Sequence, residues 1–512
     1  MTKSKTLFEI SPLFFKLVLA SKYLKAQSII LRRGMIIKGL PMPKMSADTL
    51  VKLLLCFLIP LGVLMMPIDT IPIDDLTLIQ HRLLAIFLLA ALLWVLEPVP
   101  VFATSILIIA LELIMISDKG LHLFRNPPAG HDLEELIAYT DIFSAFSSPI
   151  IILFMGGFAL AIAASKYELD NNLARVLLKP FGTQPKFIML GLMLITAVFS
   201  MFMSNTATTV MMLALLGPIV ASAPKGDLGI KALVLCIPIA ANTGGIATPI
   251  GTPPNAIALQ YLTRENSIDF LSWMMMGLPF VLVQLTLAWF LLQKLFPSSE
   301  PEMKLRLDGK FKKSWRAIVV YVTFAMTILL WMTTKVHGMN TYVVAIIPLA
   351  VFTLTGIMGK EELKLINWDV LWLVAGGIAI GIALDKTGLA EALAHAIDYE
   401  SLSPFAVVVA LSVVCWLMAN FMSNTATANL LMPIAAAIGA SMPSLVAIGG
   451  LQGLLVVVAF SASLGMILPV STPPNSLAYS TGLIESKDMA KVGLIIGLVG
   501  LFIVYGAVII LF

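Results

Sequence analysis

One heptapeptide, FMSNTAT, occurs twice in this chain, at residues 202–208 and again at 421–427. Both copies lie within long apolar stretches, although the Ser-Asn-Thr core is polar and costs free energy to bury unless it is hydrogen-bonded. An exact repeat of seven residues at so wide a separation indicates a duplicated structural unit. Any fold for this chain must therefore place one polar segment in two matching apolar settings.

The composition identifies the class of protein. Hydrophobic residues make up 59% of the 512 residues and charged residues only 12%, against about 25% charged residues in soluble domains. The apolar runs are continuous rather than alternating, which favours helices over a β-barrel. We expect an all-α polytopic membrane protein with about eleven spanning segments of roughly 20 residues, near 50–67, 82–96, 99–117, 147–164, 229–262, 268–295, 317–334, 340–358, 369–384, 444–480 and 487–511.

Two further apolar segments, 186–222 and 403–442, each hold one copy of the heptapeptide near the middle. The arms on either side have roughly 15 to 18 residues, which is too short to cross a bilayer comfortably. We therefore predict two re-entrant hairpins that carry the heptapeptide at their tips, since irregular backbone at this depth must line protein or a cavity. The alternative is a pair of ordinary spanning helices, each with a polar patch.

The heptapeptide is one of three motifs that recur in the same order. The dipeptide GG at 156–157 and the tetrapeptide TPPN at 252–255 return 220 positions later, at 376–377 and 472–475. The membrane crossings predicted between the copies are odd in number, so the second copy is expected to be inverted. Inverted repeats are typical of secondary transporters, which bind substrate where the two copies meet. The glycine pairs are expected to allow close helix packing.

Each TPPN motif lies inside a long apolar segment, 229–262 or 444–480. Two adjacent prolines remove two backbone donors and clash with the preceding turn, so the helix must break there. A Pro-kinked helix within a bundle is the alternative for one such motif. Matching breaks in both halves instead indicate a binding site.

The charged residues predict the domain organisation and the orientation. Residues 1–49 are basic and indicate an interfacial segment on the cytoplasmic surface, with a disordered basic tail as the alternative. We assign 50–296 to the first transmembrane helix and first repeat, 297–316 to a basic cytoplasmic loop, and 317–512 to the second repeat. By the positive-inside rule the N-terminus is cytoplasmic and the C-terminus lies outside, with the chain in the cytoplasmic (inner) membrane.

The tips suggest what could bind. Their hydroxyl and amide groups can donate to carboxylate oxygens or offer oxygens to a cation, and the helix that begins after each tip adds positive potential. Neither the tips nor the breaks contain Lys or Arg, so a bound dianion needs co-bound cations, which predicts sodium coupling. A single SNT tripeptide would more often be a helix N-cap. The tip residues are Ser204, Asn205, Thr206, Ser423, Asn424 and Thr425.

Taken together, the paired SNT and TPPN motifs resemble the divalent anion/sodium symporter (DASS) family, and the resemblance covers nearly the whole chain beyond residue 50. It implies a homodimer with scaffold and transport domains, an elevator-like mechanism and no organic cofactor. It also implies that the substrate is bound by the six tip residues together with Thr252, Pro253, Thr472 and Pro473. One sodium site would use Ser200, Ser204, Asn205 and Gly251, and the other Asn424, Ser471 and backbone groups near Ala419 and Met422.

One position departs from the family pattern. Many members carry a hydroxyl residue one turn before the second SNT, where this chain has Ala419. A side-chain ligand of the second sodium site is therefore missing, and the sodium stoichiometry stays open.

In having threonine in both SNT copies, the chain resembles the carboxylate carriers of the family. We therefore expect import of C4-type dicarboxylates (succinate, malate, fumarate) by sodium symport. The alternatives are a sodium-independent dicarboxylate/oxoglutarate exchanger and a sodium-coupled tricarboxylate or sulfate carrier.

No enzymatic activity is expected: DKTG at 385–388 matches a phosphorylation motif of ATP-driven pumps, but no polar nucleotide-binding domain follows it. A channel would need a continuous polar lane, whereas the polar residues of this chain cluster at the two tips and the two breaks. The expected partners are the substrate and lipid, with no nucleic acid.

Overall fold

A computed structural model of the chain describes residues 46–73, 75–126, 136–222, 224, 226–262, 266–303, 311–395 and 402–511. Most of the predicted interfacial segment 1–49 and residues 304–310 of the basic loop lie outside these ranges. The chain divides into two units, Met1–Val51 and Lys52–Phe512. The second unit contains the repeated motifs.

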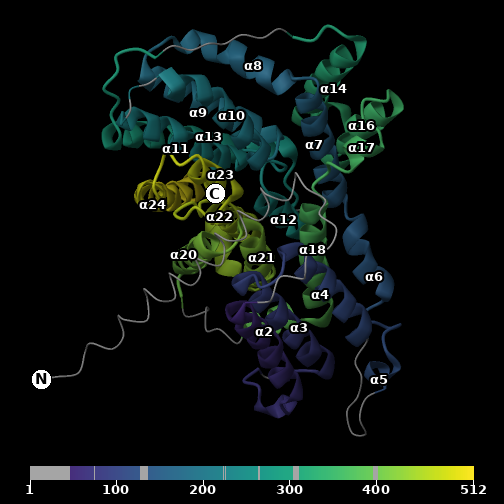
Figure 1. Cartoon of the computed structure of the whole chain (residues 1–512). Coiled ribbons are helices and arrows are strands. Elements are labelled where there is room, and N and C mark those ends of the chain that lie inside the picture. Colours follow the sequence, from purple (N-terminus) through teal and green to yellow (C-terminus); the bar gives the residue numbers. More distant parts are fainter. Residues whose placement is uncertain are drawn as a thin grey trace, which may run out of the picture. The chain divides into compact units, whose positions relative to one another are not determined.

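The described residues form helices joined by short turns, with an isolated bridge between Ser117 and Ile137 as their one β-type pairing (Figure 1). The all-α prediction is confirmed. Up to the basic loop the α-helices are α2 (Ala47–Met65), α3 (Leu78–Leu96), α4 (Val101–Met115), α5 (His122–Arg125), α6 (Tyr139–Ser144), α7 (Pro149–Lys166), α8 (Leu169–Leu178), α9 (Pro185–Phe202), α10 (Asn205–Ser222), α11 (Leu228–Gly245), α12 (Pro253–Tyr261) and α13 (Phe270–Leu295).

After the basic loop the same kinds of element return. They are α14 (Trp315–Met332), α15 (Thr334–His337), α16 (Thr341–Leu354), α17 (Lys360–Leu363), α18 (Trp368–Thr387), α19 (Leu389–His395), α20 (Pro404–Phe421), α21 (Asn424–Ser441), α22 (Gly450–Ser463), α23 (Pro473–Ser480) and α24 (Ser486–Leu511). Within the described ranges, ten helices are long and apolar enough to cross a membrane, and they include the hairpin helices α9 and α20, whose arms were predicted to be too short to cross comfortably. Shorter apolar helices lie in α4, α10, α16 and α22.

The start of the last broken helix differs from the prediction. The last broken helix was expected to begin at residue 444, but Pro443–Ile448 form a 3-10 turn and α22 begins at Gly450. Gly449 and Gly450 both have positive φ, +90° and +55°, a conformation that L side chains rarely adopt. The glycine pair therefore separates the 3-10 turn from the α-helix.

Each predicted hairpin is a pair of packed helices that meet at the heptapeptide. The helices α9 and α10 are joined by Met203 and Ser204, and α20 and α21 by Met422 and Ser423. Each predicted broken helix is likewise two helices, α11 with α12 and α22 with α23. Both short second helices begin with their two prolines at the first helical positions. An N–H at these positions would have no acceptor within the helix, so its absence breaks no helical hydrogen bond.

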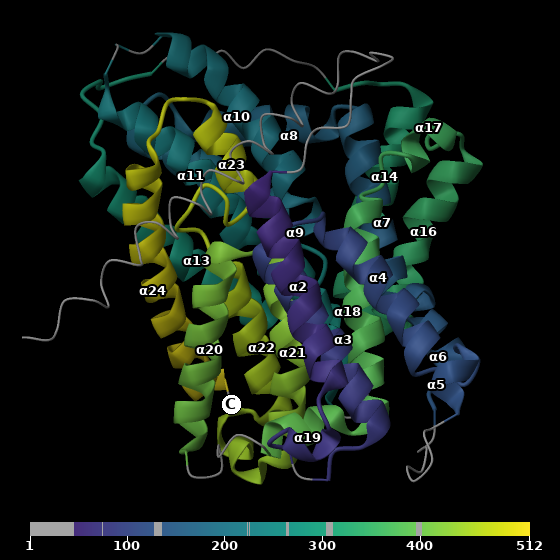
Figure 2. The ribbon, with the colours of Figure 1, turned by 60° about the horizontal axis from the view of Figure 1, so that its bottom comes forward.

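Helices of one copy pack on helices of the other. Helix α4 packs on α18 while α16 packs on α7 (Figure 2), and α12 packs on α21 and α22 while α23 packs on α10 and α11. Such reciprocal packing is expected of a duplicated unit whose copies complete each other's core. The inverted orientation of the second copy stays a prediction.

Glycines make two of these contacts possible. A Cβ at Gly156 would collide with the backbone carbonyl of Ala345 on α16, and a Cβ at Gly376 would collide with the side chain of Ser105 on α4. The first residue of each GG pair therefore permits close helix approach, as expected of small residues in membrane helices.

Across the described ranges, buried apolar side chains form two large clusters. One comes mainly from the hairpins, the broken helices, α13 and α24, and the other mainly from α3, α4, α7, α14, α16 and α18. Each group of helices thus has its own hydrophobic core.

Candidate functional site

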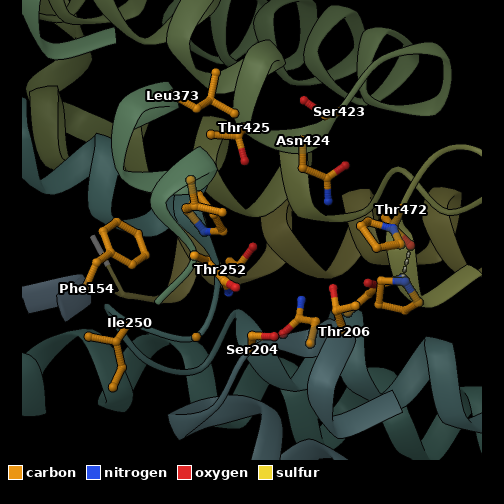
Figure 3. Close-up of a pocket in the computed structure, with 18 of the residues that line it drawn as sticks. Phe154, Ser204, Thr206, Ile250, Thr252, Leu373, Ser423, Asn424, Thr425 and Thr472 are labelled. Carbon is orange, nitrogen blue, oxygen red and sulfur yellow. Dashed lines mark hydrogen bonds between the residues drawn. The ribbon is translucent and has the colours of Figure 1, made fainter. Parts of the chain in front are cut away.

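The two hairpin tips and the two helix breaks line one cavity of about 240 Å³. Asn424 and Thr425 approach it from one side and Ser204 and Thr206 from the other, with Thr252 between them (Figure 3). All ten residues predicted to bind substrate lie in its wall, and so do Gly251 and Ser471 of the predicted sodium sites. Residues more than 200 positions apart in sequence therefore form a single site.

The serine of each tip has two roles in this geometry. Ser204 Oγ accepts a hydrogen bond from Ala207 N at 3.1 Å, and Ser423 Oγ accepts one from Ala426 N at 3.2 Å. Each serine is thus the N-cap of the helix that follows it, which satisfies a donor at the helix start. The same two residues line the cavity, so capping orients the first turn of α10 and α21 toward it.

The asparagine of each TPPN motif satisfies the carbonyls that the break leaves unpaired. Asn255 Nδ2 donates to the carbonyl oxygens of Gly245, Ile246 and Thr248, at 2.8–3.1 Å. Asn475 Nδ2 donates in the same way to Met466 O at 2.9 Å and Leu468 O at 3.0 Å. This explains how irregular backbone persists in an apolar protein interior, where unpaired carbonyls are costly.

One difference between the two breaks concerns a contact with α11. Asn242, on α11, donates from Nδ2 to Thr472 Oγ1 at 3.0 Å and to Asn475 Oδ1 at 3.2 Å. The matching oxygen in the first copy, Asn255 Oδ1, is buried and has no hydrogen-bond partner among the described residues. The sequence predictions missed Asn242, although an asparagine within an otherwise apolar helix was a usable signal.

Oxygen atoms converge near the first tip. Ser200 Oγ lies 2.5 Å from Asn205 Oδ1 and donates to Ala241 O at 2.7 Å. The same end of the Asn205 amide is 3.3 Å from Ala241 O and 3.1 Å from Gly251 O. If the amide oxygen of Asn205 is at this end, it and the oxygens of Ser200, Ala241 and Gly251 face one another, and a cation between them would balance their partial negative charges. If the amide nitrogen is at this end, it would donate to the other three oxygens. Ser204, also predicted for this site, directs its hydroxyl to its own helix.

The second tip is arranged differently. Ser471 Oγ donates to Asn420 O at 2.9 Å and accepts from Leu468 N at 3.0 Å, so it braces the break. Ala419 and Met422 are buried, and Met422 N is bonded to its own helix. Asn424 Oδ1 is buried, and the described residues offer it no hydrogen-bond partner.

The cavity wall also contains residues that sequence reasoning did not identify. Phe154, Phe158 and Leu373 give it apolar surface, and Asp369 in the first turn of α18 is its one charged lining residue among those described. The described lining residues include no Lys or Arg, so no fixed cation among them balances an anion there.

The citrate transporter family (CitMHS) matches residues 91–453 of the chain. The sodium-dependent dicarboxylate transporter SdcS of Staphylococcus saprophyticus is 31% identical over 462 residues, which cover 82% of this chain and 84% of the relative. The SdcS protein of Staphylococcus aureus is 30% identical over 461 residues, with the same two coverages.

Two solved structures have a similar fold. The YdaH transporter of Alcanivorax borkumensis has a TM-score of 0.50 at 13% identity, covering 84% of this chain and 98% of that one. MtrF of Neisseria gonorrhoeae, described as one of a class of antimetabolite efflux pumps, has a TM-score of 0.51 at 11% identity, covering 80% and 94%. At these identities the likeness concerns the fold alone.

Proposed function

Because this chain belongs to the divalent anion/sodium symporter family and carries its citrate-transporter domain, we propose that it imports C4-type dicarboxylates together with sodium ions. Succinate, malate and fumarate are the proposed substrates. The chain is thus a membrane transporter and not an enzyme, like its relatives. The observation that carries the substrate proposal is the single cavity lined by both tips and both breaks.

The anion would be held by neutral donors and helix starts. Four helices, α10, α12, α21 and α23, begin at residues that line the cavity or next to them. The first-turn N–H groups of α10 and α21 and the dipoles of all four helices favour negative charge, whereas the two prolines that begin α12 and α23 have no N–H to offer. The hydroxyls of Thr206 and Thr425 can add donors to the two carboxylates of one substrate. A carboxylate at each end of a C4 chain would fit one tip each.

Sodium would supply the positive charge that the wall lacks. In the first copy the proposed ligands are Ser200 Oγ, Asn205 Oδ1, Gly251 O and the Ser204 region, and hard monovalent cations prefer such oxygens. In the second copy they are Asn424, Ser471 and backbone groups near Ala419 and Met422. Placing cations beside the anion would couple the two binding events, because each lowers the electrostatic cost of the other.

A tricarboxylate is the second candidate, since the matching family is described as a citrate transporter. Sodium-independent exchange is the third, because Ala419 removes a hydroxyl from the second tip.

We also propose an elevator-like movement of the helices in one apolar cluster against those in the other, and a homodimer. The proposed orientation has the N-terminus in the cytoplasm and the C-terminus outside the inner membrane.

The test is uptake of radiolabelled succinate into liposomes that contain the purified protein. An inward Na⁺ gradient should drive uptake, replacement of Na⁺ by K⁺ should abolish it, and Asn205→Ala and Asn424→Ala should each lose it. Thr286→Ala is the control, because that exposed hydroxyl donates to Leu282 O, a carbonyl of its own helix. Uptake that ignores Na⁺ but needs internal dicarboxylate would instead identify an exchanger, and stronger competition by citrate or sulfate than by malate would replace the substrate class.

A further inference from the structure

The two tips differ in where a buried hydroxyl is placed. In the first copy Ser200 Oγ, on hairpin helix α9, lies between Asn205 Oδ1 and the carbonyl of Ala241 on α11. The spacing between copies is 219 in the hairpins and 220 in the broken helices. Ser200 therefore corresponds to Ala419, and Ala241 corresponds to Ser461. The serine and the alanine have exchanged helices.

Ser461 lies on the side of α22 that faces the hairpin. Val458, three positions before it, lies on the same face of α22, and Gly465 follows just after the end of this helix. Cys415 Sγ of α20 contacts Val458 O at 3.4 Å, and a Cβ on Gly465 would lie 2.5 Å from Ala419 O. Along the chain Ser461 therefore lies between these two contacts, on the helix that packs on α20, to which Ala419 belongs.

In the second copy, two buried side-chain oxygens lack hydrogen-bond partners within the part of the chain that the structure describes. Ser461 is 0% exposed, and neither Ser461 Oγ nor Asn424 Oδ1 finds a hydrogen-bond partner among the described residues. A buried polar atom without a partner is costly and needs an explanation. A serine hydroxyl on this helix can bond to a carbonyl of its own helix, because Ser463 Oγ donates to Ala459 O one turn back, at 3.1 Å.

We propose that Ser461 supplies to the second sodium site the hydroxyl that Ala419 lacks. This inference rests on the sodium coupling proposed above. Each copy then offers one serine hydroxyl and one asparagine amide oxygen, Ser200 with Asn205 and Ser461 with Asn424, and oxygens of this kind are the ligands that Na⁺ takes. Two sodium ions would balance the two charges of a dicarboxylate.

The experiment measures the Na⁺ dependence of succinate uptake in liposomes by the full-length Ser461→Ala variant, with Ser463→Ala as the matched control. The Na⁺ concentration for half-maximal uptake should rise about tenfold, the order expected when one contact to a charged group is lost, while the succinate KM at saturating Na⁺ stays unchanged. The double variant Ala419→Ser/Ser461→Ala should recover sodium affinity, because it places the hydroxyl where the first copy has it. Sodium-dependent thermal stabilisation of the purified protein without substrate gives a second readout.

The outcomes separate the two proposals. A wild-type protein whose uptake and thermal stability ignore Na⁺ would overturn sodium coupling itself. A sodium-dependent wild type with an unchanged Ser461→Ala variant would overturn only the role of Ser461, as would a sodium affinity lowered equally by Ser463→Ala. If the alanine variant does not fold, Ser461→Cys provides the same test with a nearly isosteric thiol that is a poor ligand for hard cations.

Discussion

The side-chain amide of Asn242 on α11 donates to Thr472 Oγ1 at the start of α23, 3.0 Å away. The two residues come from different copies of the repeat, so this bond joins one half of the site to the other. Thr472 Oγ1 also accepts from Asn475 N at 3.3 Å. With its oxygen accepting two bonds, the threonine can direct its hydrogen toward a ligand in the cavity.

Replacing Asn242 by alanine should therefore weaken substrate binding. The change removes both bonds and leaves Asn475 Oδ1 buried without a donor, which costs about 1–3 kcal/mol. We expect the KM for succinate to rise roughly tenfold, with the Na⁺ dependence unchanged. Uptake kinetics measure the effect. A lower melting temperature with an unaltered KM would instead show that Asn242 only stabilises the fold.

A methyl group at Gly156 should destabilise the protein. Its Cβ would meet the backbone of Ala345, which cannot rotate away as a side chain can, and overpacking of this kind costs about 1–3 kcal/mol. Thermal unfolding of purified Gly156→Ala should show a lower midpoint than that of wild type. Gly506→Ala is the control, because nothing lies within 4 Å of a Cβ there. Equal midpoints for the two variants would contradict close packing at Gly156.

Removal of the Ser200 hydroxyl should weaken sodium binding at the first tip. Ser200→Ala takes away one of the oxygens beside Asn205 Oδ1, and we expect the half-maximal Na⁺ concentration to rise about tenfold. Thr196→Val is the control, because among the described residues this hydroxyl, one turn earlier on α9, bonds only to Leu192 O of its own helix. The measurement is succinate uptake across a series of Na⁺ concentrations. An unchanged Na⁺ dependence would remove Ser200 from the proposed ligands.

Stability in acid should depend on Glu362. The hydrogen bond from Lys166 Nζ, 2.7 Å long, holds the pKa of this carboxyl below its ordinary value, and Gly359 N lowers it further. A pKa that is lower in the folded state contributes stability at pH values above the unfolded pKa, and this contribution is lost as the pH falls through the folded pKa. The melting temperature of wild type should therefore fall more between pH 6 and pH 3 than that of Glu362→Gln. Glu361→Gln, an exposed change on the same short helix, should follow wild type.

How far the sequence alone reached is clearest at the tips and breaks. SNT caps and adjacent prolines act on the backbone within a few residues, so the positions of hairpin tips and helix breaks could be predicted from local chemistry. The duplication then indicated that both pairs belong to one site, and the structure places all ten predicted substrate residues in one cavity. The family followed from the same motifs, and the comparisons confirm it.

Only the tertiary structure showed which distant side chains meet. Asn242 contacts Thr472 across 230 positions, Gly156 faces Ala345, and Ser461 lies on the helix that packs on α20, to which Ala419 belongs. No local pattern encodes these contacts, because they depend on how the helices of one copy pack on those of the other. The sequence by itself determined where the backbone must break and which polar groups it would expose. The packing of the two copies decided which of those groups are satisfied and which remain free for ligands, because a buried polar atom is paired only if its partner is brought to it.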